Sequence, residues 1–217
     1  MKGFAKTIVV LGAVGMAFTT GAPAKAKDAG DLLIRLRAVG IVPDVDGTTD
    51  LVGGDVDLNE PFVPELDFSY FFTENIAAEL ILATARFKPI VNGSALGRVD
   101  LGEVWILPPV LTAQYHFFPK HTFSPYIGAG VAYHIFYGQN EDGAPGIIND
   151  VDYDDGFGWA LQAGVDVAIG ERWSLNADVK KVFFNTDVTV QSAAGQINAN
   201  DVDIDHWIIG VGVGVRF

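Results

Sequence analysis

The sequence contains no cysteine among its 217 residues. Disulfide frameworks and thiolate metal sites are therefore excluded. Positive charge is also scarce, because 14 lysines and arginines stand against 27 aspartates and glutamates, which leaves a formal net charge of −13. A nucleic-acid partner requires a basic surface, so this balance argues against one. We expect no cofactor and no metal, since the four histidines show no metal-ligand spacing.

Long apolar runs are missing after the very start of the chain, where residues 8–18 form one. Helices that span a bilayer are therefore excluded from the rest of the sequence. Residues 1–26 have the order of a secretory signal, with a lysine-bearing start, the apolar run and small residues at 24–26. The run is too short for a membrane anchor, so we expect a signal peptide over 1–26 that is removed, and one domain over 27–217.

Glycine and aromatic residues are plentiful, with 25 glycines and 12% aromatics. The last thirteen residues, 205–217, indicate what they build. From residue 207 onward the odd positions are apolar, and they begin and end with the aromatics Trp207 and Phe217, whereas the even positions include the glycines at 210, 212 and 214. An alternation of period two is typical of a β-strand. The apolar face with its terminal aromatics suits a lipid bilayer, and the glycines suit a crowded interior.

Seven further segments alternate in the same way, at 31–42, 62–72, 76–85, 105–117, 126–137, 157–167 and 173–187. Short turns follow the second, fourth and sixth of them, and long loops follow the first, third, fifth and seventh. This arrangement is typical of outer-membrane proteins. We predict an all-β fold, an eight-stranded antiparallel transmembrane β-barrel with four long extracellular loops and three short periplasmic turns. A soluble lipocalin-like barrel is the alternative, and the aromatics at the strand ends favour lipid.

The inward side chains divide by depth, because the turns indicate which end of each strand is periplasmic. Those of the outer half are apolar and form a predicted ligand funnel: Val39, Ile41, Val63, Ile106, Pro108, Val110, Phe136, Val182, Phe184 and Ile208. Those of the periplasmic half are charged and form a predicted polar plug: Arg35, Arg37, Asp67, Glu79, Asp166, Asp178 and Arg216. A barrel of eight strands holds only its own side chains or one small ligand, so the charges should pair and close the lower half.

Three prolines weaken the predicted wall, since proline gives no amide hydrogen to a strand ladder. Pro108 and Pro109 stand in the fourth segment, and Pro64 stands in the second. We hypothesise a lateral opening at these prolines, although prolines that only mark a strand top or a bulge fit equally well. Lys181 interrupts the lipid-facing side of the seventh segment, which indicates a bulge or the membrane edge there.

Residues 107–117 have the sequence Leu-Pro-Pro-Val-Leu-Thr-Ala-Gln-Tyr-His-Phe. This stretch resembles the Leu-Pro-Pro-x-Leu-x-x-Gln-Tyr-x-Phe strand of the OmpW family, and residues 124–133, 159–166 and 214–217 also resemble segments of that family. The resemblance covers nearly the whole chain after residue 26, and the loops match least. It implies a small outer-membrane barrel, and relatives such as the alkane importer AlkL imply that hydrophobic small molecules are its cargo.

Together these features predict a barrel in the outer membrane of a Gram-negative bacterium. We expect it to pass small hydrophobic molecules from outside into that membrane, through the funnel and the lateral opening. A structural or receptor barrel that acts through its extracellular loops without transport is the alternative. No enzymatic activity is expected, because His206 with its acidic neighbours lacks a nucleophile motif. The expected partners are outer-membrane lipid, lipopolysaccharide, small hydrophobic solutes and the barrel-assembly machinery, which would read the terminal Phe217.

Overall fold

The structure is a computed structural model that describes residues 27–44, 55–94, 97–100, 102–140, 148–192 and 195–217. These residues form sixteen β-strands. Within them, no helix has the length and apolar character needed to cross a membrane. The predicted signal peptide, 1–26, lies outside the described residues.

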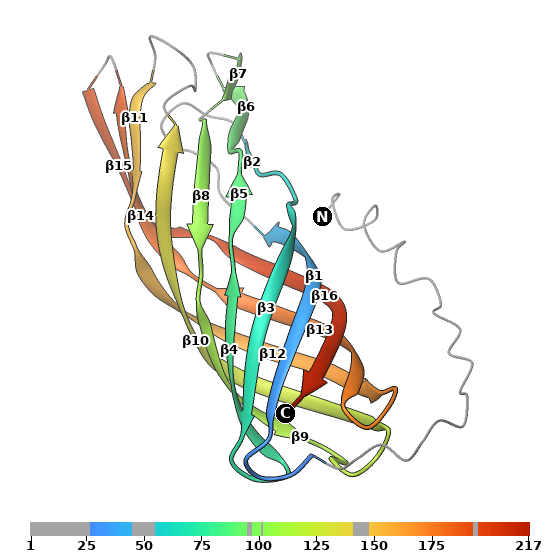
Figure 1. Cartoon of the computed structure of the whole chain (residues 1–217). Helices are drawn as coiled ribbons and strands as arrows, with labels where there is room; N and C mark the ends of the chain where they lie inside the picture. Colours follow the sequence, from blue (N-terminus) through green and yellow to red (C-terminus); the bar gives the residue numbers. More distant parts are fainter. Residues whose placement is uncertain (1–26, 45–54, 95–96, 101, 141–147, 193–194) are drawn as a thin grey trace.

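Eight strands close into an antiparallel barrel (Figure 1). They follow the order β12-β13-β16-β1-β3-β4-β9-β10, and β10 pairs with β12 to complete the ring. Their bounds are Leu32–Asp44 for β1, Phe62–Phe71 for β3, Ile76–Ala83 for β4, Val110–His116 for β9, Phe123–Asn140 for β10, Gly156–Ala168 for β12, Trp173–Phe183 for β13 and Asp205–Arg216 for β16. The predicted fold class is confirmed, and closure lets neighbouring strands satisfy the backbone groups that lipid could not.

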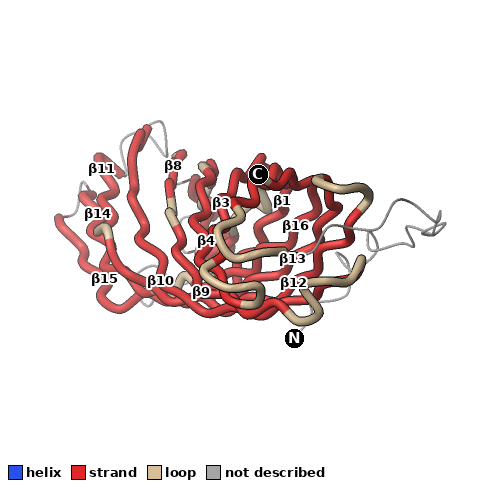
Figure 2. The backbone as a smooth tube through the Cα atoms, turned by 60° about the horizontal axis from the view of Figure 1, so that its bottom comes forward, coloured by secondary structure: helices blue, strands red, loops and turns tan. Residues whose placement is uncertain are grey.

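Additional strands extend the barrel at one end. Beyond the barrel strands, β8 (Glu103–Leu107) pairs with β10 and with β5 (Ala85–Phe87). Two separate three-stranded sheets consist of β2 (Asp55–Asp57), β6 (Ile90–Ser94) and β7 (Gly97–Asp100), and of β11 (Ile148–Tyr153), β14 (Asn185–Ser192) and β15 (Gly195–Asp203). The segments predicted as long loops therefore contain strands. In Figure 1 they rise at the end opposite the C-terminus, and Figure 2 shows β11, β14 and β15 together at one side.

Three short turns join consecutive barrel strands at the other end. Between β3 and β4, the hydroxyl of Thr73 accepts hydrogen bonds from the backbone N–H groups of Asn75 at 3.2 Å and Ile76 at 2.9 Å. Between β12 and β13, the N–H of Ile169 donates to the carbonyl of Trp173 at 2.9 Å. Side chains that bond to nearby backbone groups favour tight reversals, so the sequence encodes these turns locally.

The alternation of side chains places apolar residues outside and charged residues inside. The exposed outer face includes Leu36, Leu66, Leu80, Leu111, Ile127, Leu161, Ile209 and Val211. The buried inner face includes Arg35, Arg37, Glu65, Asp67, Glu79, Asp166, Asp178 and Lys180. This distribution is the reverse of a soluble domain and is typical of a barrel whose outer surface faces lipid.

Lys181 lies at a regular position of β13. The pairing of β13 with β12 and with β16 runs without a register shift from Trp173 to Phe183, so the bulge that was one alternative for Lys181 is absent. Its ammonium lies 2.7 Å from the carboxylate of Asp44 and 3.5 Å from that of Asp205. Carboxylates of β16 and β1, the next two strands on one side of β13, therefore neutralise this cation on the outer face.

Candidate functional site

An apolar cavity occupies the outer half of the barrel. Its empty space, with the open mouth included, is about 880 Å³. All but two of the predicted funnel residues line it: Val39, Ile41, Ile106, Pro108, Val110, Phe136, Phe184 and Ile208. The two exceptions, Val63 and Val182, lie outside the lining. Val182 is buried in the hydrophobic cluster around the cavity, and Val63 packs against that cluster.

Several lining residues were not among the predicted funnel residues. They are Pro43, Leu58, Glu65, Ile81, Ala83, Ala85, Phe87, Pro89, Val104, His134, Tyr153, Ile204 and His206. Ile81, Ala85 and His134 lie on inward faces that the alternation does predict, but their depth depends on how far each strand is staggered against the next. Tyr153 belongs to a strand within a predicted loop, where no periodicity pointed to the cavity.

Arg35 of β1 forms the lower part of a buried network beneath the cavity. Its guanidinium contacts three carboxylates: Nη1 lies 2.9 Å from Asp67 and 3.1 Å from Glu79, while Nε and Nη2 donate to the two oxygens of Asp166 at 3.1 and 2.9 Å. Nη1 also donates to the hydroxyl of Ser69 at 2.7 Å. Two parallel bonds from one guanidinium to one carboxylate give the strongest ion-pair geometry available to a side chain.

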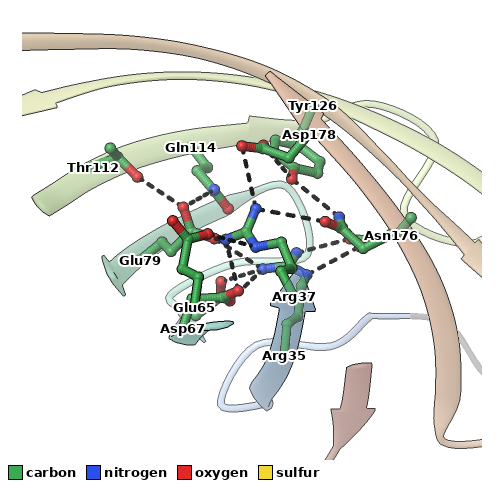
Figure 3. Close-up of polar contacts among 12 residues, drawn as sticks. Arg35, Arg37, Glu65, Asp67, Glu79, Thr112, Gln114, Tyr126, Asn176 and Asp178 are labelled. Carbon is green, nitrogen blue, oxygen red and sulfur yellow. Dashed lines mark hydrogen bonds and ion pairs between the residues drawn. The ribbon is translucent and has the colours of Figure 1, made fainter. Parts of the chain in front are cut away.

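Arg37 forms the upper part of the same network (Figure 3). Its Nε lies 2.9 Å from Glu65, and its Nη2 lies 2.6 Å from Asp67 and 2.8 Å from Glu79. Nη1 lies 3.3 Å from Asp178, which Lys180 also contacts at 2.9 Å. Arg35 and Arg37 point the same way from one strand because they are two residues apart, and both are fully enclosed.

Neutral side chains complete the network around the carboxylates. Glu79 accepts hydrogen bonds from the amide nitrogens of Gln114 and Gln162, both at 2.8 Å. Asp178 accepts one from the hydroxyl of Tyr126 at 2.7 Å. Buried charges are stable only when their remaining hydrogen-bonding capacity is also satisfied, and these neutral side chains contribute to it at Glu79 and Asp178.

Lys27 joins the network from below, which the sequence did not predict. Its ammonium donates to Asp166 at 2.8 Å, to Ser124 at 3.1 Å and to Nδ1 of His116 at 2.8 Å. An ammonium has no lone pair, so Nδ1 of His116 must be an acceptor. Nε2 of that ring then carries the hydrogen and donates to Gln114 at 3.0 Å. The hydrogen bonds therefore assign a neutral imidazole to this position.

Arg216, the remaining predicted plug residue, has contacts near the periplasmic end of the barrel. Its Nε is 3.5 Å from Asp31, and its Nη2 donates to the carbonyl of Glu171 at 2.8 Å. Both partners are close to the periplasmic turns. The depth prediction placed Arg216 too high, because the last residues of β16 extend to the rim of the barrel.

The network closes the lower half of the barrel. Among the described residues, four cations (Lys27, Arg35, Arg37 and Lys180) pair with five carboxylates (Glu65, Asp67, Glu79, Asp166 and Asp178). Side chains of this size fill an eight-stranded barrel. An apolar molecule in the cavity therefore meets a floor of ion pairs, with Glu65 at its surface.

The double proline interrupts strand pairing on one side only. Pro108 and Pro109 separate β8 from β9. Toward β10 the ladder is nearly continuous across them, because the N–H of Tyr133 donates to the carbonyl of Pro109 at 3.0 Å. Toward β4 and β5, pairing stops at Ile81 with Val110 and resumes at Ala85 with Ile106. The prolines thus weaken the wall between the β4–β5 and the β8–β9 strands.

A longer unpaired stretch lies one strand away, beside Pro64. The last pair between β3 and β4 is Glu65 with Ala83. Beyond it, residues 62–64 of β3 pair with β1, and β5 pairs with β8. Within the described part of the chain, no backbone pairing joins β3 to β5. Glu65, Ala83 and Ala85 all line the cavity, so the cavity extends to this unpaired part of the wall.

Comparison with known proteins identifies this architecture. The model of the OmpW family matches residues 28–217. The chain belongs to the OmpW family. A relative of this OmpW-family barrel is the outer-membrane protein y4mB of Sinorhizobium fredii, which is 43% identical over 185 residues and is matched over 85% of this chain and 79% of its own length. The family and fold place the chain in the outer membrane of a Gram-negative bacterium.

Two solved outer-membrane protein structures share the barrel. The crystal structure of OprG from Pseudomonas aeruginosa has a TM-score of 0.78 with 26% identity, and the match covers 89% of this chain and 99% of OprG. The solid-state NMR structure of AlkL in lipid bilayers has a TM-score of 0.69 with 28% identity, covering 93% of this chain and 97% of AlkL. In sequence, AlkL of Ectopseudomonas oleovorans is 31% identical over 170 residues, which are 77% of this chain and 71% of AlkL.

Proposed function

We propose that this OmpW-family barrel passes small hydrophobic molecules from outside the cell into the outer membrane, and that it does so without a catalytic step. The observation that carries the proposal is the apolar cavity of the outer half, which ends on a floor of buried ion pairs. Apolar solutes are stabilised in such a cavity because binding removes their surface from water. Below the cavity, the buried ion pairs offer apolar solutes only polar surroundings, which do not stabilise them.

The proposed exit is sideways, between β3 and β5. Residues 62–64 lack a partner strand on that side within the described chain, and the cavity lining includes residues from both flanks. Pro64 cannot offer an N–H to either neighbouring strand. The break in pairing at Pro108 and Pro109 removes backbone hydrogen bonds that would hold β4 and β5 to β8 and β9. The missing bonds would let β4 and β5 move away from β3.

The proposal includes export and maturation. We propose that residues 1–26 are a signal peptide and that the mature barrel begins at Lys27. Under this proposal the first mature residue supplies the ammonium that contacts Asp166, His116 and Ser124. Lipopolysaccharide and the barrel-assembly machinery are proposed partners during membrane residence and biogenesis.

Uptake of a labelled alkane tests the lateral route. Vesicles with lipopolysaccharide in the outer leaflet would carry either the unmodified chain, Pro64→Val, or Pro108→Ala with Pro109→Ala. Pro64→Val restores one backbone donor and the double variant restores two. One hydrogen bond is worth about 1 kcal/mol, so uptake should fall by about fivefold for each restored hydrogen bond that closes the gap. Pro125→Ala is the matched control, because Pro125 lies in β10 where it is paired with Val165.

The outcome also separates transport from the receptor alternative. Octane uptake by the unmodified barrel above that of empty vesicles supports transport. Uptake equal to that of empty vesicles contradicts it and favours a barrel that acts through its extracellular strands. Uptake that is unchanged in both proline variants contradicts the lateral exit alone.

A further inference from the structure

The apolar lining of the cavity contains two imidazoles, His134 of β10 and His206 of β16. Their ring centroids lie 5.7 Å apart, and the rings are nearly perpendicular at 89°. Phe184 stacks on His134 with centroids 3.9 Å apart. The two histidines thus form a small polar patch within a wall of hydrocarbon and aromatic side chains.

His134 has unused hydrogen-bonding capacity. Its side chain is only 2% exposed, and neither ring nitrogen has a hydrogen-bond partner among the described residues. Buried polar groups are nearly always hydrogen-bonded, because an unpaired one loses its interactions with water. A neutral imidazole has one donor and one acceptor nitrogen. Since the terminal torsion of histidine is broad, rotation of the ring can bring a nitrogen to the cavity surface.

His206 supplies a second acceptor. Its Nδ1 lies 3.1 Å from the carbonyl oxygen of Ile204. A carbonyl can only accept, so Nδ1 must carry the hydrogen and Nε2 is left with a lone pair. The polar patch therefore offers one donor and two acceptors. Glu65 at the floor differs from this patch, because its carboxylate already contacts Arg37 at 2.9 Å and Lys180 at 3.3 Å.

The class of ligand follows from these groups. A metal site is disfavoured, since two imidazoles are too few for a zinc site of the usual kind, and the described residues contain no cluster of three or more metal-binding side chains. A charged ligand would place an unpaired ion against the apolar lining. A hydroxyl group both donates and accepts, which matches the patch, and its hydrocarbon would contact Val39, Ile41 and Ile208.

We propose that the cavity preferentially binds a neutral apolar molecule with one hydroxyl group, an alcohol or a phenol, and that the hydroxyl bonds to His134 and His206. This inference rests on the proposed function, because it specifies the cargo of the same cavity. The hydrocarbon supplies the affinity that an alkane would also have. The hydroxyl adds a hydrogen bond that an alkane cannot make.

Titration of the full barrel in lipid nanodiscs tests this preference. The ligands are 1-octanol and nonane, which have the same number of heavy atoms, with concentrations expressed as mole fraction in the lipid. The methyl signals of Ile208 report occupancy of the cavity, and the imidazole nitrogen signals of His134 report contact with the hydroxyl. We expect both ligands to shift the methyl signals, 1-octanol alone to shift the imidazole signals, and 1-octanol to half-saturate at about fivefold lower mole fraction.

His134→Phe keeps a ring that can stack on Phe184 and removes both nitrogens. It should abolish the preference for 1-octanol and leave nonane binding unchanged. His121→Phe is the matched control, because His121 is exposed in a periplasmic turn, and it should keep the preference. If His134→Phe does not fold, His206→Phe and the comparison of the two ligands on the unmodified barrel still test the inference.

Two results would contradict different parts of the proposal. Equal half-saturation by 1-octanol and nonane, or a preference retained in His134→Phe, overturns the hydroxyl site but leaves hydrophobic transport standing. If neither ligand shifts the Ile208 methyl signals, the cavity does not take hydrophobic solutes and the proposed function fails with it.

Discussion

Arg37 illustrates how a single inward side chain stabilises the whole lower barrel. Its guanidinium contacts carboxylates from β3, β4 and β13, namely Glu65, Asp67, Glu79 and Asp178. A buried ion pair is not in itself evidence of net stability, since desolvation offsets much of the attraction. Removal of one partner lowers stability, because the remaining charges stay buried without an opposite charge beside them.

Arg37→Met should therefore destabilise the barrel strongly. We expect the free energy of unfolding to fall by about 3–5 kcal/mol, as is usual when one member of a buried charge network is deleted. Urea titration in lipid vesicles, followed by tryptophan fluorescence, measures the change.

Lys120→Met provides the control for that experiment. Lys120 and Glu74 form an exposed pair between periplasmic turns at 2.8 Å, and the hydrogen bond that Lys120 donates to the Glu74 carboxylate raises the pKa of Lys120. Exposed pairs contribute little to stability, so the unfolding midpoint should stay where it is. If the unfolding midpoint of Arg37→Met equals that of the unmodified barrel, the carboxylates of the network do not need Arg37 to remain buried, and the prediction is wrong.

At the scale of elements, β16 shows why glycine alternates with apolar residues in the closing strand. A Cβ at Gly212 would overlap the backbone of Leu36 and Arg37, and a Cβ at Gly210 would lie 2.7 Å from a methyl group of Val39. Large side chains of β1 therefore occupy the space beside the inward face of β16, where the glycines have no side chains. Arg37 can reach across the barrel because the strand beside it has no side chains in the way.

Gly212→Ala tests this close approach. The added methyl group has no space, so β16 must shift away from β1, and overpacking of this kind costs about 1–3 kcal/mol. Gly40→Ala is the control on the neighbouring strand, because a Cβ there meets nothing within 4 Å. Unfolding in urea should give a lower midpoint for Gly212→Ala and an unchanged or slightly higher one for Gly40→Ala. Equal midpoints for the two variants would contradict the packing argument.

At the scale of the whole molecule, the barrel is divided into an open outer half and a closed lower half. The additional strands lie at the outer end and the short turns at the opposite end (Figure 1). The outer half also holds the cavity, and the lower half holds the charge network. Water and ions would have to displace paired side chains to pass through. Under the proposed function, this division would separate access for apolar solutes from permeability to ions.

Planar-bilayer recording tests that separation. We expect no persistent conductance steps from the unmodified barrel in simple salt, because the four buried cations and five carboxylates hold each other in place. A porin of similar preparation serves as the positive control, since its wider barrel encloses an aqueous channel. Stable, salt-dependent steps from this barrel would show that the lower half opens.

Sequence alone was sufficient to predict the barrel, the number of its strands and the direction of nearly every barrel side chain. These follow from an alternation of period two, which is a local property of an extended backbone. Arg35, Arg37, Asp67, Glu79, Asp166 and Asp178 were predicted to lie inside for this reason, and they do. The apolar and charged halves also followed, because each turn indicates which end of a strand is which.

Which inward residues contact one another could not be predicted from the sequence and depends on how the strands pair. The stagger between neighbouring strands sets the depth of each side chain, and that stagger depends on backbone pairing between residues far apart in sequence. It brought Lys27 and Glu65 into the charge network, left Arg216 at the rim and placed His134 beside His206. The strand stagger also left β3 and β5 without backbone pairing, one strand away from Pro108 and Pro109. Such a break depends on the relative position of two strands, so it cannot be predicted from the sequence of either strand alone.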